Sequence, residues 1–166
     1  MNPPPQVDSK EVSLVFSRLH SGLSFSEQSV ELFFKAIFSL YPQGPVGELS
    51  LVFMQRNAHN KLHGEFLNDF RPTDVITFPP DPEEHMAGEI CVSVDQAFEE
   101  SNSRKIPFCK ELSLYLIHGW LHLVGFDDLE KVERQQMRFE EERCMNHIEK
   151  LNAWPDFKLA PNESQG

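Results

Sequence analysis

The sequence predicts a single α+β domain, residues 1–166, in which a small mixed sheet of about four strands packs against helices. The chain has 166 residues, of which 40% are hydrophobic and 25% are charged, which suits one domain with a sizeable core. Segments with strand and helix features follow one another without strict alternation, and no repeat or linker divides the chain. We expect only the polar ends, about 1–10 and 155–166, to be flexible tails.

The first half of the chain contains two predicted strands and two predicted helices. Residues 11–16 (EVSLVF) and 47–54 (GELSLVFM) alternate between apolar and polar side chains, which is the period of a half-buried strand. Residues 24–40 carry an apolar stripe of helical spacing, and Ser24 with a glutamate three residues later predicts a capping box. Residues 57–66 (NAHNKLHGEF) are predicted to form a short helix.

Two shorter strands follow in the second half. Residues 73–78 (TDVITF) are rich in β-branched side chains and precede the sequence PPDP, a combination typical of a short strand. Residues 88–94 (GEICVSV) form the fourth predicted strand. Asp95 has the residue type of an N-cap, which predicts a helix that continues to about Ser101.

A long apolar helix is predicted to begin at Pro107, because proline is favoured at the first helical position, and to end near Val124. Gly125 suits the position just beyond a helix, and Phe126 after it could make the hydrophobic contact of a Schellman motif. A last helix covers about residues 129–151.

The long helix carries two histidines, His118 and His122, in the apolar segment LIHGWLHLVGFDD. They are about one turn apart and therefore share a face. Buried imidazoles need partners for their nitrogens, and Zn²⁺ readily binds neutral imidazole. The spacing alone is weak support, because His59 and His63 are also four apart. That second pair lies among polar residues, and we expect it to be a solvated surface or a substrate-facing rim.

A catalytic zinc ion needs a third protein ligand, and the aspartates directly after the helix are the candidates. Asp127 and Glu130 match the pattern of a capping box for the next helix, which leaves Asp128 as the better ligand. Asp128 could itself be the cap, so the choice between the two aspartates stays open. The predicted metal site thus lies on the long helix and the loop after it.

Three motifs resemble those of the YbeY endoribonucleases, the rRNA-maturation proteins. The segment HGWLHLVGFDD resembles the family signature, and the upstream segments TDVITFP and AGEICVSVDQA resemble two further family motifs, in the same order and spacing. The resemblance implies a single α+β domain that binds one zinc ion through His118, His122 and the residue at position 128. It also implies a cytoplasmic endoribonuclease for single-stranded RNA, acting in rRNA 3′-end maturation and ribosome quality control.

Two positions depart from the family pattern. Many members have histidine at the position of Asp128, and a carboxylate there keeps a zinc site but makes the bound water less acidic. Many members also have arginine directly after the aromatic residue Phe66, where this chain has Leu67. Arg71, Lys61 or Arg56 could take over the stabilisation of phosphate charge, and Arg71 and Lys61 are the candidate catalytic residues.

Two other polar residues near the motifs, and one aromatic residue, have alternative roles. Asp74 could act as a general base, although a capping role at the start of a strand is the more ordinary interpretation. Glu111, seven residues before His118, could orient an imidazole or be a solvated acid of the first turn. Trp120 lies on another face of the helix and is predicted to pack in the core.

Charge and composition limit the partners. The net charge is −11, which argues against non-specific binding of polyanions and disfavours DNA. We expect single-stranded rRNA in the ribosome as the partner, presented by another protein, for which a ribosomal protein is one candidate. A basic cluster between Arg56 and Arg71 could offer a local surface for RNA.

Several classes are disfavoured by the same sequence. It starts without the apolar core of a secretory signal, and no apolar run reaches the roughly 20 residues that span a membrane, so we expect a cytoplasmic protein without a membrane partner. Cys91, Cys109 and Cys144 are too far apart for a thiolate zinc site and are expected to be buried or half-buried thiols.

Two other functions stay open. A non-catalytic, metal-binding ribosome-assembly factor gains support from Leu67 and from the acidic charge. Another metal hydrolase, such as a peptidase, is disfavoured because Gly119 stands where zinc peptidases place a general-base glutamate directly after the first histidine.

Overall fold

The structure is a computed structural model that describes residues 11–67 and 73–161. A four-stranded mixed sheet lies at its centre, in the order β1-β3-β5-β4. Three strands run parallel to one another: β1 (Val12–Arg18), β3 (Gly47–Met54) and β5 (Met86–Ser93). The fourth, β4 (Val75–Phe78), is antiparallel to its neighbour β5. The predicted α+β class and small mixed sheet are confirmed.

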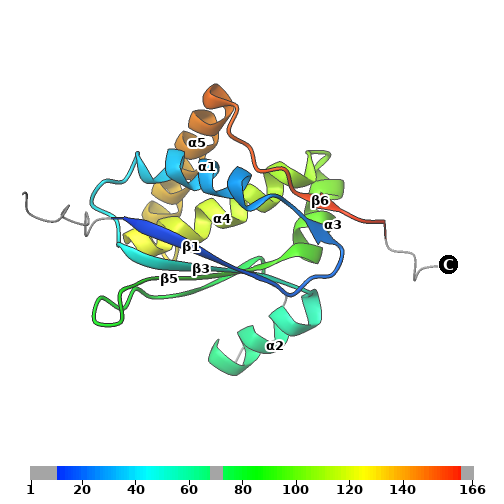
Figure 1. Ribbon diagram of the computed structural model, residues 1–166, viewed down its shortest axis with the longest axis horizontal. Helices are drawn as coiled ribbons and strands as arrows, with labels where there is room; N and C mark the ends of the chain where they lie inside the picture. Colours follow the sequence, from blue (N-terminus) through cyan, green and yellow to red (C-terminus); the bar gives the residue numbers. More distant parts are fainter. Residues whose placement is uncertain (1–10, 68–72, 162–166) are drawn as a thin grey trace, which may run out of the picture.

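Helices cover both faces of this sheet. Their bounds are α1 (Glu27–Phe38), α2 (Arg56–Leu67), α3 (Val94–Arg104), α4 (Phe108–Val124) and α5 (Lys131–Leu151). Figure 1 shows α1, α4 and α5 on one face of the sheet and α2 on the other. Each predicted helix is present, with bounds that differ by a few residues, because the apolar periodicity of these segments is strong.

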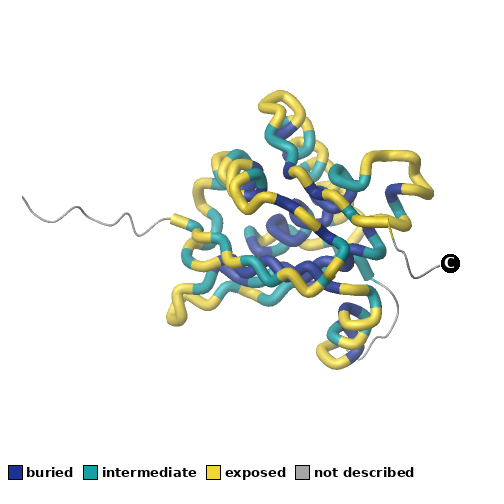
Figure 2. The backbone as a smooth tube through the Cα atoms, turned by 45° about the vertical axis from the view of Figure 1, so that its right-hand side comes forward, coloured by how far each residue is buried: buried dark blue, intermediate teal, exposed yellow. Residues whose placement is uncertain are grey.

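The main core lies between the sheet and helices α1, α4 and α5, and it follows β3, β5 and α4 through the middle of the molecule (Figure 2). α4 is buried on most of its circumference, which explains why its sequence is apolar nearly all round. Trp120 is 1% exposed and its ring centroid lies 4.7 Å from that of Phe38. Its predicted role in packing is confirmed.

α4 approaches β5 so closely that residue 119 has no room for a side chain. A Cβ atom at Gly119 would lie 2.5 Å from Cγ2 of Ile90, well inside van der Waals contact. The packing of α4 on the sheet therefore excludes a glutamate at this position, whatever its chemistry. A general base therefore cannot stand directly after the first histidine of this helix, as it does in zinc peptidases.

The caps of α1 and α3 differ from the predicted ones. Ser26, rather than Ser24, caps α1, and Ser93, rather than Asp95, caps α3; each accepts a hydrogen bond from the backbone N–H three residues later. The Asp95 carboxylate instead accepts a hydrogen bond of 2.8 Å from the backbone N–H of Arg56. Asp95 therefore makes a tertiary contact with α2 instead of the helix cap that the local sequence predicts.

The chain after α5 is part of the folded domain. Phe157 is 5% exposed, and its ring centroid lies 5.3 Å from that of Phe25. The next two residues form a short antiparallel ribbon, β6 (Lys158–Leu159) with β2 (Leu23–Ser24). The prediction of a flexible tail is wrong for residues 155–160; residues 1–10 and 162–166 lie outside the described residues.

α2 buries the histidine pair that was predicted to be solvated. His59 is 0% and His63 is 9% exposed, and Nε2 of His59 lies 2.9 Å from the carbonyl oxygen of Cys91 in β5. The helix packs on a second, smaller apolar cluster of the sheet, on the face away from α4. Arg56 is paired with Glu99, so the described part of α2 does not present the expected basic cluster.

Candidate metal centre

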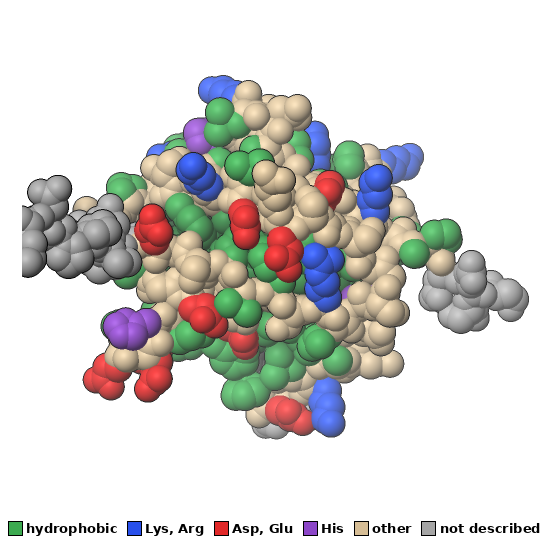
Figure 3. Space-filling view, in the orientation of Figure 1, with side chains coloured by type: hydrophobic (Ala, Val, Ile, Leu, Met, Phe, Trp, Pro, Cys, Tyr) green, Lys and Arg blue, Asp and Glu red, His purple; other side chains and the backbone are tan. Residues whose placement is uncertain are grey.

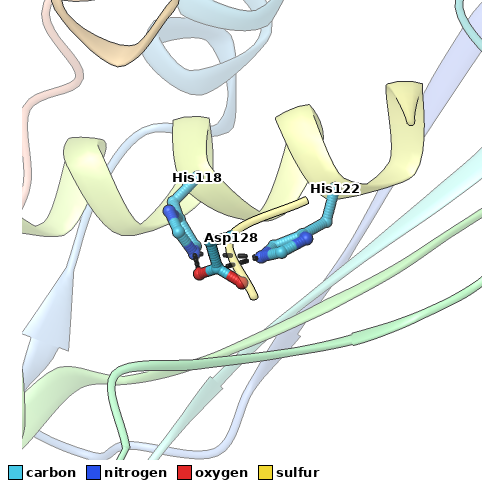
Figure 4. A group of neighbouring side chains, drawn as sticks. All are labelled: His118, His122 and Asp128. Atoms are coloured by element: carbon cyan, nitrogen blue, oxygen red, sulfur yellow. Dashed lines mark hydrogen bonds and ion pairs between the residues drawn. The ribbon is translucent and has the colours of Figure 1, made fainter. Parts of the chain in front are cut away.

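His118 and His122 face each other along one side of α4 (Figure 4). Pro107 takes the N-cap position of this helix rather than its predicted first helical position, and the helix ends at Val124. The side chains of the two histidines are 20% and 23% exposed. The pair therefore lies at the rim of the core, where both side chains are largely sheltered but still accessible to solvent.

Asp128 reaches the histidines because the chain reverses directly after α4. Gly125 has φ of 121°, its N–H donates to the carbonyl of His122 at 3.1 Å, and the N–H of Phe126 donates to that of Leu121 at 2.9 Å. These are the two hydrogen bonds of a Schellman motif, as predicted. The turn brings the Asp128 carboxylate between the two imidazoles (Figure 4).

The three donor atoms converge with the spacing that a zinc ion requires. Oδ2 of Asp128 lies 3.4 Å from Nε2 of His118 and 3.6 Å from Nε2 of His122, and the two Nε2 atoms are 3.0 Å apart. Ligands at about 2.0 Å in a tetrahedron are separated by about 3.3 Å. The residues thus fit one divalent ion, with a fourth position left for water or substrate. Within residues 11–67 and 73–161 no other such group of three is found.

A further carboxylate contacts the histidines from α5. Oε1 of Glu141 lies 3.0 Å from Nδ1 of His118, so the Nδ1–H group of His118 donates a hydrogen bond to the Glu141 carboxylate. This leaves the lone pair of Nε2 directed at the point where the donor atoms meet. Sequence reasoning missed Glu141, because no local pattern shows that α5 folds back against α4.

The acidic surroundings favour positive charge at this place. Burial alone lowers the pKa of His118, but the hydrogen bond and charge of Glu141, together with the charges of Asp74 and Asp128, raise this pKa above its ordinary value. A metal cation benefits from the same negative field as the imidazolium proton.

Asp127 occupies a different position from Asp128. Its Oδ1 lies 4.0 Å from Nδ1 of His122, on the far side of that ring from the converging atoms, and its side chain is 55% exposed. It also does not cap α5, whose N-cap is Glu130 without a side-chain hydrogen bond. The predicted capping box is wrong, and the geometry selects Asp128 as the candidate ligand.

A cleft of about 580 Å³ opens beside His118, between α3, α5 and the first half of α4. Its lining includes Asp74, Arg104, Glu111 and Arg138. Glu111 is 1% exposed, and burial raises the pKa of its carboxyl group. It is therefore not a solvated acid, and the imidazole partner is Glu141 instead, so both roles predicted for Glu111 are wrong.

The predicted phosphate-binding residues are not brought to this cleft by the described part of the chain. Lys61 is exposed on α2 and is not among the residues that line the cleft, and Arg71 lies outside the described residues. Phe66 is 62% exposed and packs edge-on against Phe78. Arg104 and Arg138 are the cationic side chains that line the cleft.

Two further predictions concern the whole chain. Cys91 and Cys144 are buried and Cys109 is partly buried, all as free thiols, as expected. In the described part of the chain, none of the helices combines the length and hydropathy needed to cross a membrane.

Comparisons with known proteins show which family this chain resembles. The family model described as Endoribonuclease YbeY matches residues 19–149. A protein of Protochlamydia amoebophila named Endoribonuclease YbeY is 35% identical over 136 residues, which cover 80% of this chain and 90% of the relative. One of the same name from Alkaliphilus metalliredigens is 31% identical over 148 residues, 82% and 96% of the two chains. A solution structure of a Thermotoga maritima protein superimposes with a TM-score of 0.57 at 22% identity, covering 84% of this chain and 93% of that one, and supports the fold.

Proposed function

The chain belongs to the YbeY endoribonuclease family, and from this membership we propose that it is a metal-dependent endoribonuclease with one zinc ion held by His118, His122 and Asp128. The family supports cleavage of RNA as the reaction. The choice of zinc follows from the donor set, because two imidazoles and a carboxylate suit Zn²⁺.

The observation that carries the proposal is the convergence of three electron-pair donors, which are also hydrogen-bond acceptors. Because Nδ1 of His118 donates to Glu141, its Nε2 is an acceptor, and it faces Oδ2 of Asp128 at 3.4 Å and Nε2 of His122 at 3.0 Å. Acceptors at such distances repel one another unless a proton or a cation lies between them. A divalent ion satisfies all three at once.

The metal ion and its three proposed ligands have different roles in the proposed reaction. When bound, a divalent ion at this place supplies a Lewis acid for a phosphodiester oxygen and activates water for attack. His118 and His122 would contribute neutral ligands, and Asp128 would contribute one negative charge, so a divalent ion with these three ligands alone would carry one net positive charge. The cleft beside His118 gives a single strand a path past the centre.

Phosphate charge needs cations besides the metal. We propose that Lys61 and Arg71 act here as catalytic residues in place of the family arginine; Arg138, which lines the cleft, is the alternative. Three variants test this choice: Lys61→Ala, Arg71→Ala and Arg138→Ala. Each should retain zinc. The variant that removes the phosphate-binding side chain should cleave RNA roughly 100-fold more slowly.

The proposed substrate is single-stranded rRNA in the cytoplasm, cleaved during 3′-end maturation and ribosome quality control. Acidic and basic side chains are interspersed on the face shown in Figure 3, and the net charge is −11. Such a chain gains little affinity from non-specific attraction to phosphates. We therefore propose that a protein partner, such as a ribosomal protein, presents the RNA.

The test is cleavage of a labelled single-stranded RNA by zinc-loaded protein, with a duplex of the same sequence as the substrate control. His122→Ala, purified in the same way, controls for contaminating nuclease. We expect the wild type to cut the single strand and His122→Ala to be inactive. Equal activity in both proteins would assign the cleavage to a contaminant.

A second function has support from the missing arginine at Leu67. A ribosome-assembly factor with structural zinc would bind the metal with the same residues and leave RNA intact. Zinc-loaded wild type that cuts no RNA, free or within ribosomal particles, would establish this function in place of the nuclease.

A further inference from the structure

The contact between Glu141 and His118 joins α5 to the metal centre. We propose that Glu141 is a positioning residue, which fixes the orientation and tautomer of His118 for metal binding through Nε2. The inference rests on the proposed metal-dependent function, and it adds a residue outside the ligand set. Glu141 does not touch the converging donor atoms, so its effect passes through the imidazole.

The first argument is the place of Glu141 in α5. The buried residues of this helix are Met137, Cys144 and Ile148, and residue 141 falls on the same stripe, four after the first and three before the second. An apolar side chain would suit that stripe, yet a carboxylate stands there, with its side chain 19% exposed. A sheltered carboxylate costs free energy of desolvation unless it has a strong partner. Its partner is Nδ1 of His118, at 3.0 Å.

The second argument is tautomeric. An ionised carboxylate only accepts hydrogen bonds, so Glu141 holds the proton of a neutral His118 on Nδ1. The lone pair of Nε2 then points to the place where Asp128 and His122 converge. Without Glu141 the proton is free to move to Nε2, and the ring is free to turn about its side-chain bonds. Both changes remove the ligand atom from the centre.

The third argument is charge. A divalent ion with two neutral imidazoles and Asp128 carries one net positive charge. Glu141 adds one negative charge in contact with a ligand ring, which brings the assembly to neutrality at the edge of the core. The negative charge also strengthens the imidazole as an electron-pair donor.

A structural role and a positioning role for Glu141 predict opposite results for Glu141→Leu. Leucine completes the apolar stripe, so the metal-free variant should unfold at the same or a higher urea concentration than the wild type. Its affinity for Zn²⁺ should nevertheless fall by roughly 10- to 100-fold, and that of Glu141→Gln by less, because the amide oxygen can still accept a hydrogen bond from Nδ1–H of His118. If the carboxylate of Glu141 had only a structural role, Glu141→Leu would lower the stability of the protein and leave its affinity for Zn²⁺ unchanged.

The experiment is competition for Zn²⁺ between each protein and a chromophoric chelator, together with urea unfolding in EDTA. Glu142→Gln is the matched control, because it removes the same charge from an exposed neighbour on the same helix, and it should bind Zn²⁺ within about twofold of the wild type. Equal zinc affinity in wild type and Glu141→Leu would overturn the inference and leave the proposed nuclease intact. Reduced affinity in Glu141→Leu, with a zinc-loaded wild type that cuts no RNA, would uphold it and refute the nuclease. A wild type that binds no Zn²⁺ would refute both.

Discussion

Asp127 and Asp128 are neighbours in the chain whose carboxylates reach different atoms. Only Asp128 lies among the converging Nε2 atoms, whereas Asp127 lies outside the ring of His122. If the proposed zinc site is correct, we expect the wild type to bind about one zinc ion per chain, Asp128→Ala to lose it and Asp127→Ala to retain it. Metal content after dialysis, measured by plasma mass spectrometry, distinguishes them. Loss in Asp127→Ala with retention in Asp128→Ala would move the third ligand to Asp127.

His59 predicts how stability depends on pH. Burial lowers its pKa in the folded protein, while in the unfolded chain the pKa is about 6.5. Below that pH the unfolded chain binds a proton that the folded chain does not, so the free energy of unfolding falls as the pH decreases. The variant His59→Leu should lose less stability between about pH 7.5 and about pH 5.

Urea unfolding of both proteins in EDTA measures this difference without a contribution from metal binding. Other titrating groups are common to the two chains and cancel in the comparison. If wild type and His59→Leu lost the same stability over this pH range, the pKa of His59 in the folded protein would not be lowered, and the prediction would be wrong.

Residue-level prediction succeeded where the geometry is local. His118, His122 and Asp128 lie within eleven positions, and one helix with its Schellman turn brings them together. Glu141 and the burial of His59 depend on how α5 and α2 pack against distant elements. Sequence near these residues carries no signal for such contacts, so the grouping of His118, His122 and Asp128 could be predicted, whereas the contact of Glu141 with His118 could not.

Among the elements, the turn after α4 has the most direct effect on the metal centre. Gly125 has φ of 121°, and no atom lies within 4 Å of the place where a Cβ would be, so a side chain there meets conformational strain alone. We expect Gly125→Ala to lower the free energy of unfolding by about 1 to 3 kcal/mol and to weaken zinc binding, because the turn places Asp128. Urea unfolding and chelator competition measure the two effects. An unchanged zinc affinity in a destabilised protein would show that Asp128 is placed independently of the turn.

Helix and strand positions were predictable because apolar periodicity reports burial directly. The helix caps were harder to predict. Ser24 and Asp95 have residue types that cap helices, but Ser24 lies in β2. The carboxylate of Asp95 accepts a hydrogen bond from the backbone N–H of Arg56. Asp127 likewise lies beside the metal centre rather than at the start of α5. Local rules state which residues can cap a helix, whereas tertiary contacts decide which ones do.

The stability of the whole domain depends on the segment after α5, which contains Phe157. Phe157 packs among aromatic rings of the main core, although it lies more than a hundred residues from them in the chain. We expect Phe157→Ala to lower the free energy of unfolding by about 3 to 5 kcal/mol, and Lys158→Ala, at an exposed neighbour, by less than about 0.5 kcal/mol. Thermal and urea unfolding of both variants test this. Equal effects of the two substitutions would show that the segment is not part of the cooperative unit.

The same segment marks the limit of prediction for the fold as a whole. Residues 155–166 are polar in composition, and one buried phenylalanine does not change that average. The α+β class, by contrast, was readable from the order of strand and helix patterns along the chain. The sheet order β1-β3-β5-β4 was not, because which strands become neighbours is decided by packing across the whole domain.

The order of these parts along the chain also sets the order in which they are made. Every strand of the main sheet lies before residue 94, the candidate metal ligands come only at 118 to 128, and Phe157 closes the core near the end. Because synthesis proceeds from the N-terminus, the sheet leaves the ribosome before the helices that carry the centre. A chain whose last third has not yet been made therefore contains the strands of the sheet but lacks the candidate metal ligands.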